Sequence, residues 1–143
     1  MYFEELGLNE PITLSPVTVD KAEMLSFAQS YDNIPLHTDE AYAKTTPFGK
    51  LLAPGVLSFL LVWAKYLEQD FFGEELLAGT STKIEWHKPV FAGDTLYGTA
   101  QITEKTPRNA RNGLAVLTIT AENQHGEKVL TGTVEGIVKR IEN

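Results

Sequence analysis

The run from Val56 to Leu67 constrains this chain more than any other part of its sequence. Only Ser58 and Lys65 are clearly polar within it, and Pro54-Gly55, directly before it, suits the start of a helix. A helix that is apolar nearly all round must be covered by other structure on most sides. Because the run is shorter than the roughly 20 residues needed to span a bilayer, we expect a buried helix at the centre of the fold.

Length, charge and cysteine content exclude several classes of protein. The chain has 143 residues, enough for one self-sufficient core, so we treat residues 1–143 as a single domain. It has no cysteine and three scattered histidines, which excludes disulfides and thiol nucleophiles and argues against a metal site. A formal charge of −7 argues against binding a nucleic-acid backbone. The acidic start, Met1 to Glu5, does not resemble a targeting segment, so we expect a cytoplasmic protein with no membrane partner.

The segment before the apolar run predicts short elements and a loop. Residues 12–19 tolerate a β conformation, and Asp20 can start a helix whose apolar positions recur at helical spacing up to Tyr31. Pro35 disfavours a longer helix. Thr38 can cap a second short helix that ends at Ala43. Two prolines and two glycines between Thr45 and Gly55 then indicate an irregular loop.

After Gly79 the pattern changes to the period of two that is typical of strands. We expect strands over residues 84–91, 95–102, 114–121 and 129–141, joined by turns at residues 93–94, 107–113 and 125–126. Four long antiparallel strands in a meander, with one strand before the buried helix, predict an α+β protein. A curved antiparallel sheet that wraps around one long buried helix is the hot-dog fold.

Asp32 and His37 are the candidates for catalysis. They lie five residues apart in a proline-stiffened loop between the two longer helices, where a carboxylate and an imidazole can converge on one water molecule. Most such residues are solvated or form local turn hydrogen bonds, so the pair alone is a weak signal. The surrounding sequence makes it a stronger one.

The sequence from Tyr31 to Ala43, followed by Thr46 to Gly55, resembles the hydratase loop of the MaoC-like family, which includes the R-specific enoyl-CoA hydratases. That pattern is Asp-x-x-Pro-x-His, then a small residue and Phe, then Gly at the start of the buried helix. Lys88 to Asp94 is similar to the family's Pro-Val-x-x-Gly-Asp segment. These features follow one another along the whole chain in the family's order.

The resemblance implies reversible addition of water to a trans-2-enoyl thioester of coenzyme A or of an acyl carrier protein. It implies that Asp32 and His37 activate the water, and that the backbone amide of Gly55 stabilises the developing charge on the thioester oxygen. It also implies a set of substrate-binding residues, namely Asn33, Ile34, Phe48, Pro54, Val56 and Ser58. Coenzyme A would enter only as part of the substrate, so we expect no cofactor and no metal.

Two alternatives stay open, and the first of them rests on a departure from the family pattern. Much of the family has Asn or Gln where this chain has Ile34, whose side chain cannot form the same hydrogen bond. A non-catalytic acyl-thioester-binding partner subunit is therefore one alternative. Acyl-thioester hydrolysis is the other, although hydrolases of this fold place a carboxylate in or beside the buried helix, and residues 56–67 contain none.

The remaining polar residues have simpler interpretations. We expect His87 and His125 at the surface or in turns, and Ser58, without a neighbouring base, in a pocket wall. Basic residues at or near the hairpins could contact coenzyme A phosphates, although a solvated face explains most of them: Lys105, Arg108, Arg111 and Lys128. A single sheet around one helix leaves open strand edges, so we expect a homodimer or a higher even oligomer.

Overall fold

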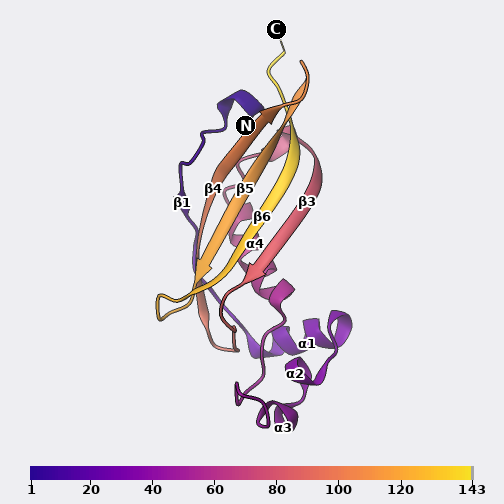
Figure 1. Ribbon diagram of the computed structural model, residues 1–143, viewed down its shortest axis with the longest axis vertical. Helices are drawn as coiled ribbons and strands as arrows, with labels where there is room; N and C mark the ends of the chain where they lie inside the picture. Colours follow the sequence, from indigo (N-terminus) through magenta and orange to yellow (C-terminus); the bar gives the residue numbers. More distant parts are fainter. Residues whose placement is uncertain (143) are drawn as a thin grey trace.

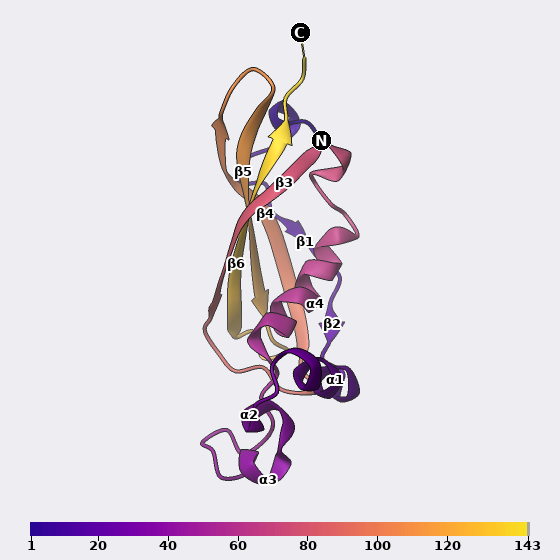
Figure 2. The same ribbon diagram turned by 90° about the vertical axis from the view of Figure 1, so that its right-hand side faces the viewer.

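The computed structural model describes residues 1–142 and confirms the hot-dog architecture. Two short strands, β1 (Ile12–Thr13) and β2 (Val17–Thr18), precede the helices α1 (Lys21–Tyr31), α2 (Pro35–Thr38), α3 (Glu40–Ala43) and α4 (Gly55–Leu67). Four long strands follow: β3 (Leu76–Trp86), β4 (Thr95–Pro107), β5 (Asn112–Glu122) and β6 (Lys128–Lys139). Two 3₁₀ turns, η1 (Phe3–Glu5) and η2 (Gly73–Glu75), complete the chain. Figures 1 and 2 show α4 lying along one face of the sheet, with α1, α2 and α3 gathered at one end.

The sheet has the order β1-β4-β5-β6-β3, with β2 also paired to β4. This order corrects the predicted meander, because β3 pairs with β6 and not with β4. The strand expected over residues 84–91 lies earlier, at Leu76–Trp86, and Gly93-Asp94 is therefore not the turn of a hairpin. As a result β3 forms one edge of the sheet, and its outer edge has no strand beside it in the described chain.

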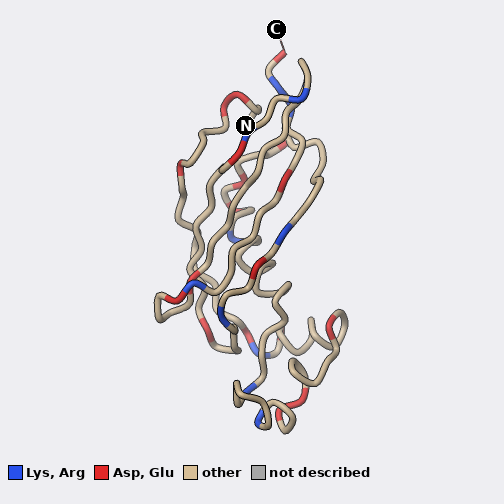
Figure 3. The backbone as a smooth tube through the Cα atoms, viewed as in Figure 1, with Lys and Arg blue, Asp and Glu red and all other residues tan. Residues whose placement is uncertain are grey.

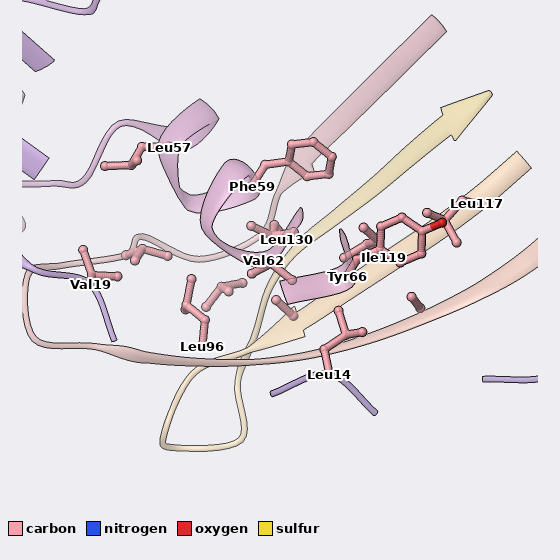
Figure 4. Packing of buried hydrophobic residues seen from close by; sticks show 14 of the residues in the cluster. Leu14, Val19, Leu57, Phe59, Val62, Tyr66, Leu96, Leu117, Ile119 and Leu130 are labelled. Atoms are coloured by element: carbon pink, nitrogen blue, oxygen red, sulfur yellow. The ribbon is translucent and has the colours of Figure 1, made fainter. Parts of the chain in front are cut away.

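The core lies between α4 and the concave face of the sheet (Figure 4). Phe59, Val62 and Tyr66 of α4 are at most 5% exposed, and they face strands whose buried residues alternate along β5. Gly132 on β6 makes room for Phe59, since a Cβ there would lie 2.4 Å from its ring. Each fully buried aliphatic side chain here contributes about 1.5–3 kcal/mol to the free energy of folding.

The structure confirms one of the two predicted helix caps and corrects the other. Asp20 caps α1 as expected, with its carboxylate accepting from the Glu23 amide at 2.9 Å. Thr38 does not cap α3, because Pro35 begins a separate helical turn that already contains it. Asp39 takes that role and accepts from the Tyr42 amide at 3.0 Å.

The buried Tyr66 hydroxyl ties the end of α4 to the chain that follows. It donates to Asp70 Oδ1 at 3.3 Å and accepts from the Phe71 amide at 3.0 Å, and burial raises the pKa of Tyr66 far above its usual value. We expect Tyr66→Phe to lower the free energy of unfolding by about 1–2 kcal/mol, because the Phe71 amide loses its acceptor. Urea denaturation measures this, with Tyr97→Phe at an exposed tyrosine as the matched control. Equal losses in the two variants would contradict the assigned role.

Candidate functional site

Three segments converge at the start of α4 and line an open cavity of about 320 Å³. The α1–α2 connection provides Asp32 and His37. The loop into α4 and the first turn of that helix provide Leu52, Ala53, Gly55, Val56 and Ser58. The end of β3 provides Trp86, and the chain after it provides Lys88, Pro89 and Val90. The lining is mostly apolar, with a few polar groups, as in typical sites for small molecules.

Local geometry fixes both residues of the predicted pair. α1 ends at Tyr31, so Asp32 is its C-cap, and its amide donates to Ala28 O at 2.9 Å. Pro35 occupies the first position of α2, which places His37 inside a single helical turn. His37 is buried, whereas the side chain of Asp32 is 41% exposed.

The hydrogen bonds of the imidazole define its tautomer. Nδ1 of His37 lies 2.6 Å from the carbonyl oxygen of Leu52, and since a carbonyl oxygen only accepts, Nδ1 carries a proton. Nε2 lies 3.2 Å from Oδ2 of Asp32. In the neutral ring with its proton on Nδ1, the lone pair of Nε2 faces the carboxylate oxygen of Asp32. The two atoms attract each other only when a proton lies between them. The pair can therefore accept and return a proton.

Gly55 begins α4 opposite the pair. In the described chain no acceptor is bonded to its amide, and the Pro54 cap provides no side-chain hydrogen bond. Free amides in the first turn, together with the helix dipole, favour negative charge at this point. Glycine leaves room here for the Trp86 indole, since a Cβ would lie 2.4 Å from its Cε2 and 2.6 Å from its Nε1.

The other predicted site residues divide into two groups. Val56 and Ser58 line the cavity, and Pro54 is buried beside it, where its carbonyl accepts from the Ser58 hydroxyl at 3.4 Å. Asn33, Ile34 and Phe48 are exposed and do not line it, so their role in substrate binding stays a prediction.

The basic residues named near the hairpins do not gather at this cavity. Lys105 donates to Leu6 O at 2.8 Å and Arg108 to Asn112 Oδ1 at 3.0 Å. The hairpin between β4 and β5 lies at the opposite end of the sheet from α2 (Figure 1). His87 and His125 are exposed, as expected.

Trp86 and Lys88 are lining residues that were not predicted from the sequence. Both follow from the position of β3, which ends at Trp86 and carries the chain back across the start of α4. Ala53 N–H donates to Val90 O at 2.8 Å and holds the two segments together. The only sequence signal for these two lining residues was the Pro-Val motif of the Lys88 to Asp94 segment. That motif does not show that the segment lies beside His37, because this follows from the pairing of Ala53 with Val90, which are far apart in the sequence.

Comparison with known proteins shows what the chain is similar to. The profile of the family described as "MaoC like domain" matches residues 6–124. An uncharacterized protein of Bacillus subtilis, YdeM, is 25% identical over 98% of this chain and 100% of its own length. No described helix is long and apolar enough to cross a membrane.

Solved structures show the same fold over nearly the whole chain. The monoamine oxidase regulatory protein from Archaeoglobus fulgidus has a TM-score of 0.92 at 30% identity, covering 99% of this chain and 95% of its own. The R-hydratase PhaJ1 from Pseudomonas aeruginosa has a TM-score of 0.77 at 27% identity, covering 99% of this chain and 86% of its own.

Proposed function

Because this chain belongs to the MaoC-like domain family, we propose that it is a hydratase that adds water reversibly to trans-2-enoyl thioesters and forms 3-hydroxyacyl thioesters. One observation carries the proposal. The Asp32–His37 pair, with its 3.2 Å contact, faces the same cavity as the unbonded amide of Gly55. The R-hydratase to which the chain is similar supports this reaction class.

The reaction requires a base, an acid and a place for negative charge. Water attacks the β-carbon of the enoyl group, and the proton that it gives up passes to the Asp32–His37 pair, which returns one proton to the α-carbon. Electron density moves meanwhile onto the thioester oxygen. The Gly55 amide donates to this oxygen, where the dipole of α4 adds to the stabilisation. The proposed reaction needs no cofactor and no metal.

The two alternatives have less support. Hydrolysis would draw on a carboxylate in or beside the buried helix. Gly55–Leu67 contains no Asp or Glu, and the Asp32 carboxylate near its start is paired with His37 at 3.2 Å. A non-catalytic role rested on Ile34, but that side chain is 44% exposed and outside the cavity lining. Having Ile34 in place of the family's Asn or Gln therefore takes no polar group away from the cavity wall.

The proposal is tested by the loss of enoyl absorbance when the protein is mixed with trans-2-butenoyl-CoA. Short, branched and long enoyl chains should be compared, because the cavity dimensions do not fix the acyl length. Free thiol is measured in the same samples. Loss of absorbance without thiol release is the expected result. Thiol release instead would support hydrolysis, and no change with any chain would contradict catalysis.

We further propose that the chain acts as a homodimer. Along the free edge of β3 nearly every residue is exposed, and an antiparallel copy of the same strand would match its backbone donors and acceptors. Beside it, α4 leaves an apolar stripe uncovered at helical spacing, formed by Val56, Leu60 and Leu67, each 41–47% exposed. The helix predicted to be wrapped on most sides is thus open along this stripe within one chain.

Replacing Leu60 by glutamate should convert the dimer to a monomer, because a charge on the stripe would be buried unpaired in the interface. Light scattering after size-exclusion chromatography measures the mass. Tyr97→Glu is the matched control, since Tyr97 is 49% exposed on β4, away from the β3 edge. Dissociation of the control alone, or a monomeric native protein, would contradict the assignment.

A further inference from the structure

A second hollow, of about 300 Å³, lies beyond the cavity of Asp32 and His37. It is lined by four charged side chains and four other residues: Lys21, Glu40, Lys44, Lys50, Gly49, Leu51, Phe91 and Ala92. A third depression, of about 360 Å³, joins the two: it shares Lys88 and Pro89 with the cavity, and Lys50 and Phe91 with the hollow. The three depressions therefore follow one strip of chain, residues 88–92.

The hollow is held at a fixed place relative to the catalytic pair. Leu52 forms an isolated antiparallel bridge with Phe91, and the Leu52 carbonyl accepts from His37 Nδ1. Lys50 lies two residues before Leu52, so its Cα is within about 7 Å of that of Leu52 along an extended chain. A linear ligand that reaches the Asp32–His37 pair can therefore extend along residues 88–92 to Lys50.

Charge in the hollow is unbalanced. Glu40 pairs with Lys21, and the hydrogen bond from Lys21, with a smaller contribution from Lys44, lowers the pKa of Glu40. In the part of the chain that the structure describes, neither Lys44 nor Lys50 has a carboxylate within 4.0 Å. The Lys50 ammonium instead lies 4.4 Å from the centre of the Phe91 ring. Two uncompensated positive charges thus face one hollow in a protein of formal charge −7.

Figure 3 shows basic positions near α2 and α3 and a second set near the C-terminus, at the other end of the molecule. The second set includes Arg111, Lys139 and Arg140 around a hollow of about 620 Å³. Arg140 is engaged by Glu4 at 2.9 Å. Within one chain only the set near α3 adjoins the cavity that holds Asp32 and His37.

We infer that Lys44 and Lys50 bind the phosphate groups of coenzyme A, so that the substrates are coenzyme A thioesters; this rests on the proposed hydratase function. The pantetheine arm lies along residues 88–92, with its thioester at Gly55 and its phosphates at the hollow. Ammonium groups on flexible stems suit phosphates, which they bind as point charges. A carrier-protein thioester brings only one phosphodiester, at the far end of its pantetheine arm, whereas coenzyme A brings a diphosphate and a third phosphate to two lysines.

The test compares kcat/KM for trans-2-butenoyl-CoA with kcat/KM for trans-2-butenoyl-pantetheine, which has the same reacting group and no phosphate. In Lys44→Ala/Lys50→Ala the ratio of the two values should fall about tenfold from that of the native protein, as expected for the loss of a charge-assisted contact. Added salt should also lower this ratio for the native protein, because salt screens the attraction between ammonium groups and phosphates. An unchanged ratio overturns the inference, while native activity on either thioester still upholds the hydratase.

The matched control is Arg111→Ala/Lys139→Ala, which removes the same charge at the opposite end of the chain. It should keep the native ratio. If it lowers the ratio and the Lys44/Lys50 variant does not, the phosphates lie at that end and the inference is wrong. The inference is also overturned if the Lys44/Lys50 variant loses activity on a carrier-protein thioester but not on the coenzyme A thioester.

Binding of coenzyme A itself is measured by titration calorimetry, which does not depend on catalysis. Weaker binding by the Lys44/Lys50 variant than by the native protein supports the inference even if no enoyl thioester is hydrated. Equal binding by the two proteins, or no binding by either, overturns it.

Discussion

Replacing His37 by alanine should lower kcat for hydration of trans-2-butenoyl-CoA by at least about 10²-fold, the lower end of what a positioned acid–base group contributes. The Nδ1–H bond to Leu52 O directs Nε2 toward Asp32, and alanine removes the group that exchanges the proton. KM should change much less, because the imidazole acts on water and not on the thioester. Asp32→Asn, which keeps the size of the side chain, should also reduce kcat.

The control for this prediction is His87→Ala. His87 is exposed, bonds to Thr131 Oγ1 at 3.0 Å, and lies outside the cavity. It should retain native kcat. Because His37 is buried, circular dichroism and urea denaturation must accompany the assay to establish that each variant is folded. A folded His37→Ala protein with more than a third of the native kcat would contradict the assigned role.

Replacing Gly55 by alanine should lower kcat/KM by about 10²-fold, comparable to the loss of one donor to a developing oxyanion. The added methyl would overlap the Trp86 indole, at 2.4 Å from Cε2, so either the ring or the first turn of α4 must move. Alanine keeps the N–H, so the expected loss comes from this displacement, which moves the amide relative to the cavity. Kinetics on trans-2-butenoyl-CoA measures the loss.

A double-mutant cycle with Trp86→Ala separates the two causes. If the overlap with the indole lowers stability, Gly55→Ala should cost less free energy of unfolding when Trp86 is already alanine. Activity should recover in part in the double variant relative to Trp86→Ala, because the amide N–H is retained and the methyl no longer meets the indole. Activity that stays low in the double variant would assign the loss to Gly55 itself and not to the overlap with the indole, and full activity in Gly55→Ala would contradict the role of the amide.

The central helix and the catalytic loop could be predicted because their signals are local. The apolar run from Val56 gave the position of α4 to within one residue, and the Pro35 effect on Ile34 gave the end of α1. Asp32 and His37 lie close together because a single helical turn separates them. These features depend on sequence neighbours alone.

The position of β3 could not be predicted in the same way. Alternation arises when one face of a strand is buried, but β3 is an edge strand with nearly every residue exposed, so Gly79 to Lys83 carry no period of two. The apolar residues farther along, Ile84 and Val90, shifted the predicted strand toward the loop. Trp86 and Lys88 were missed for the same reason, because their places in the cavity follow from where β3 ends.

The most direct measurement of the central claim is the fate of labelled water. Native protein and trans-2-butenoyl-CoA are incubated in H₂¹⁸O, and the products are analysed by mass spectrometry. The account predicts a 3-hydroxybutanoyl thioester that contains one ¹⁸O atom at the β-carbon, formed by the native protein and at least about 10²-fold more slowly by His37→Ala. Label in a free carboxylic acid, with release of coenzyme A and no hydroxyacyl thioester, would contradict it.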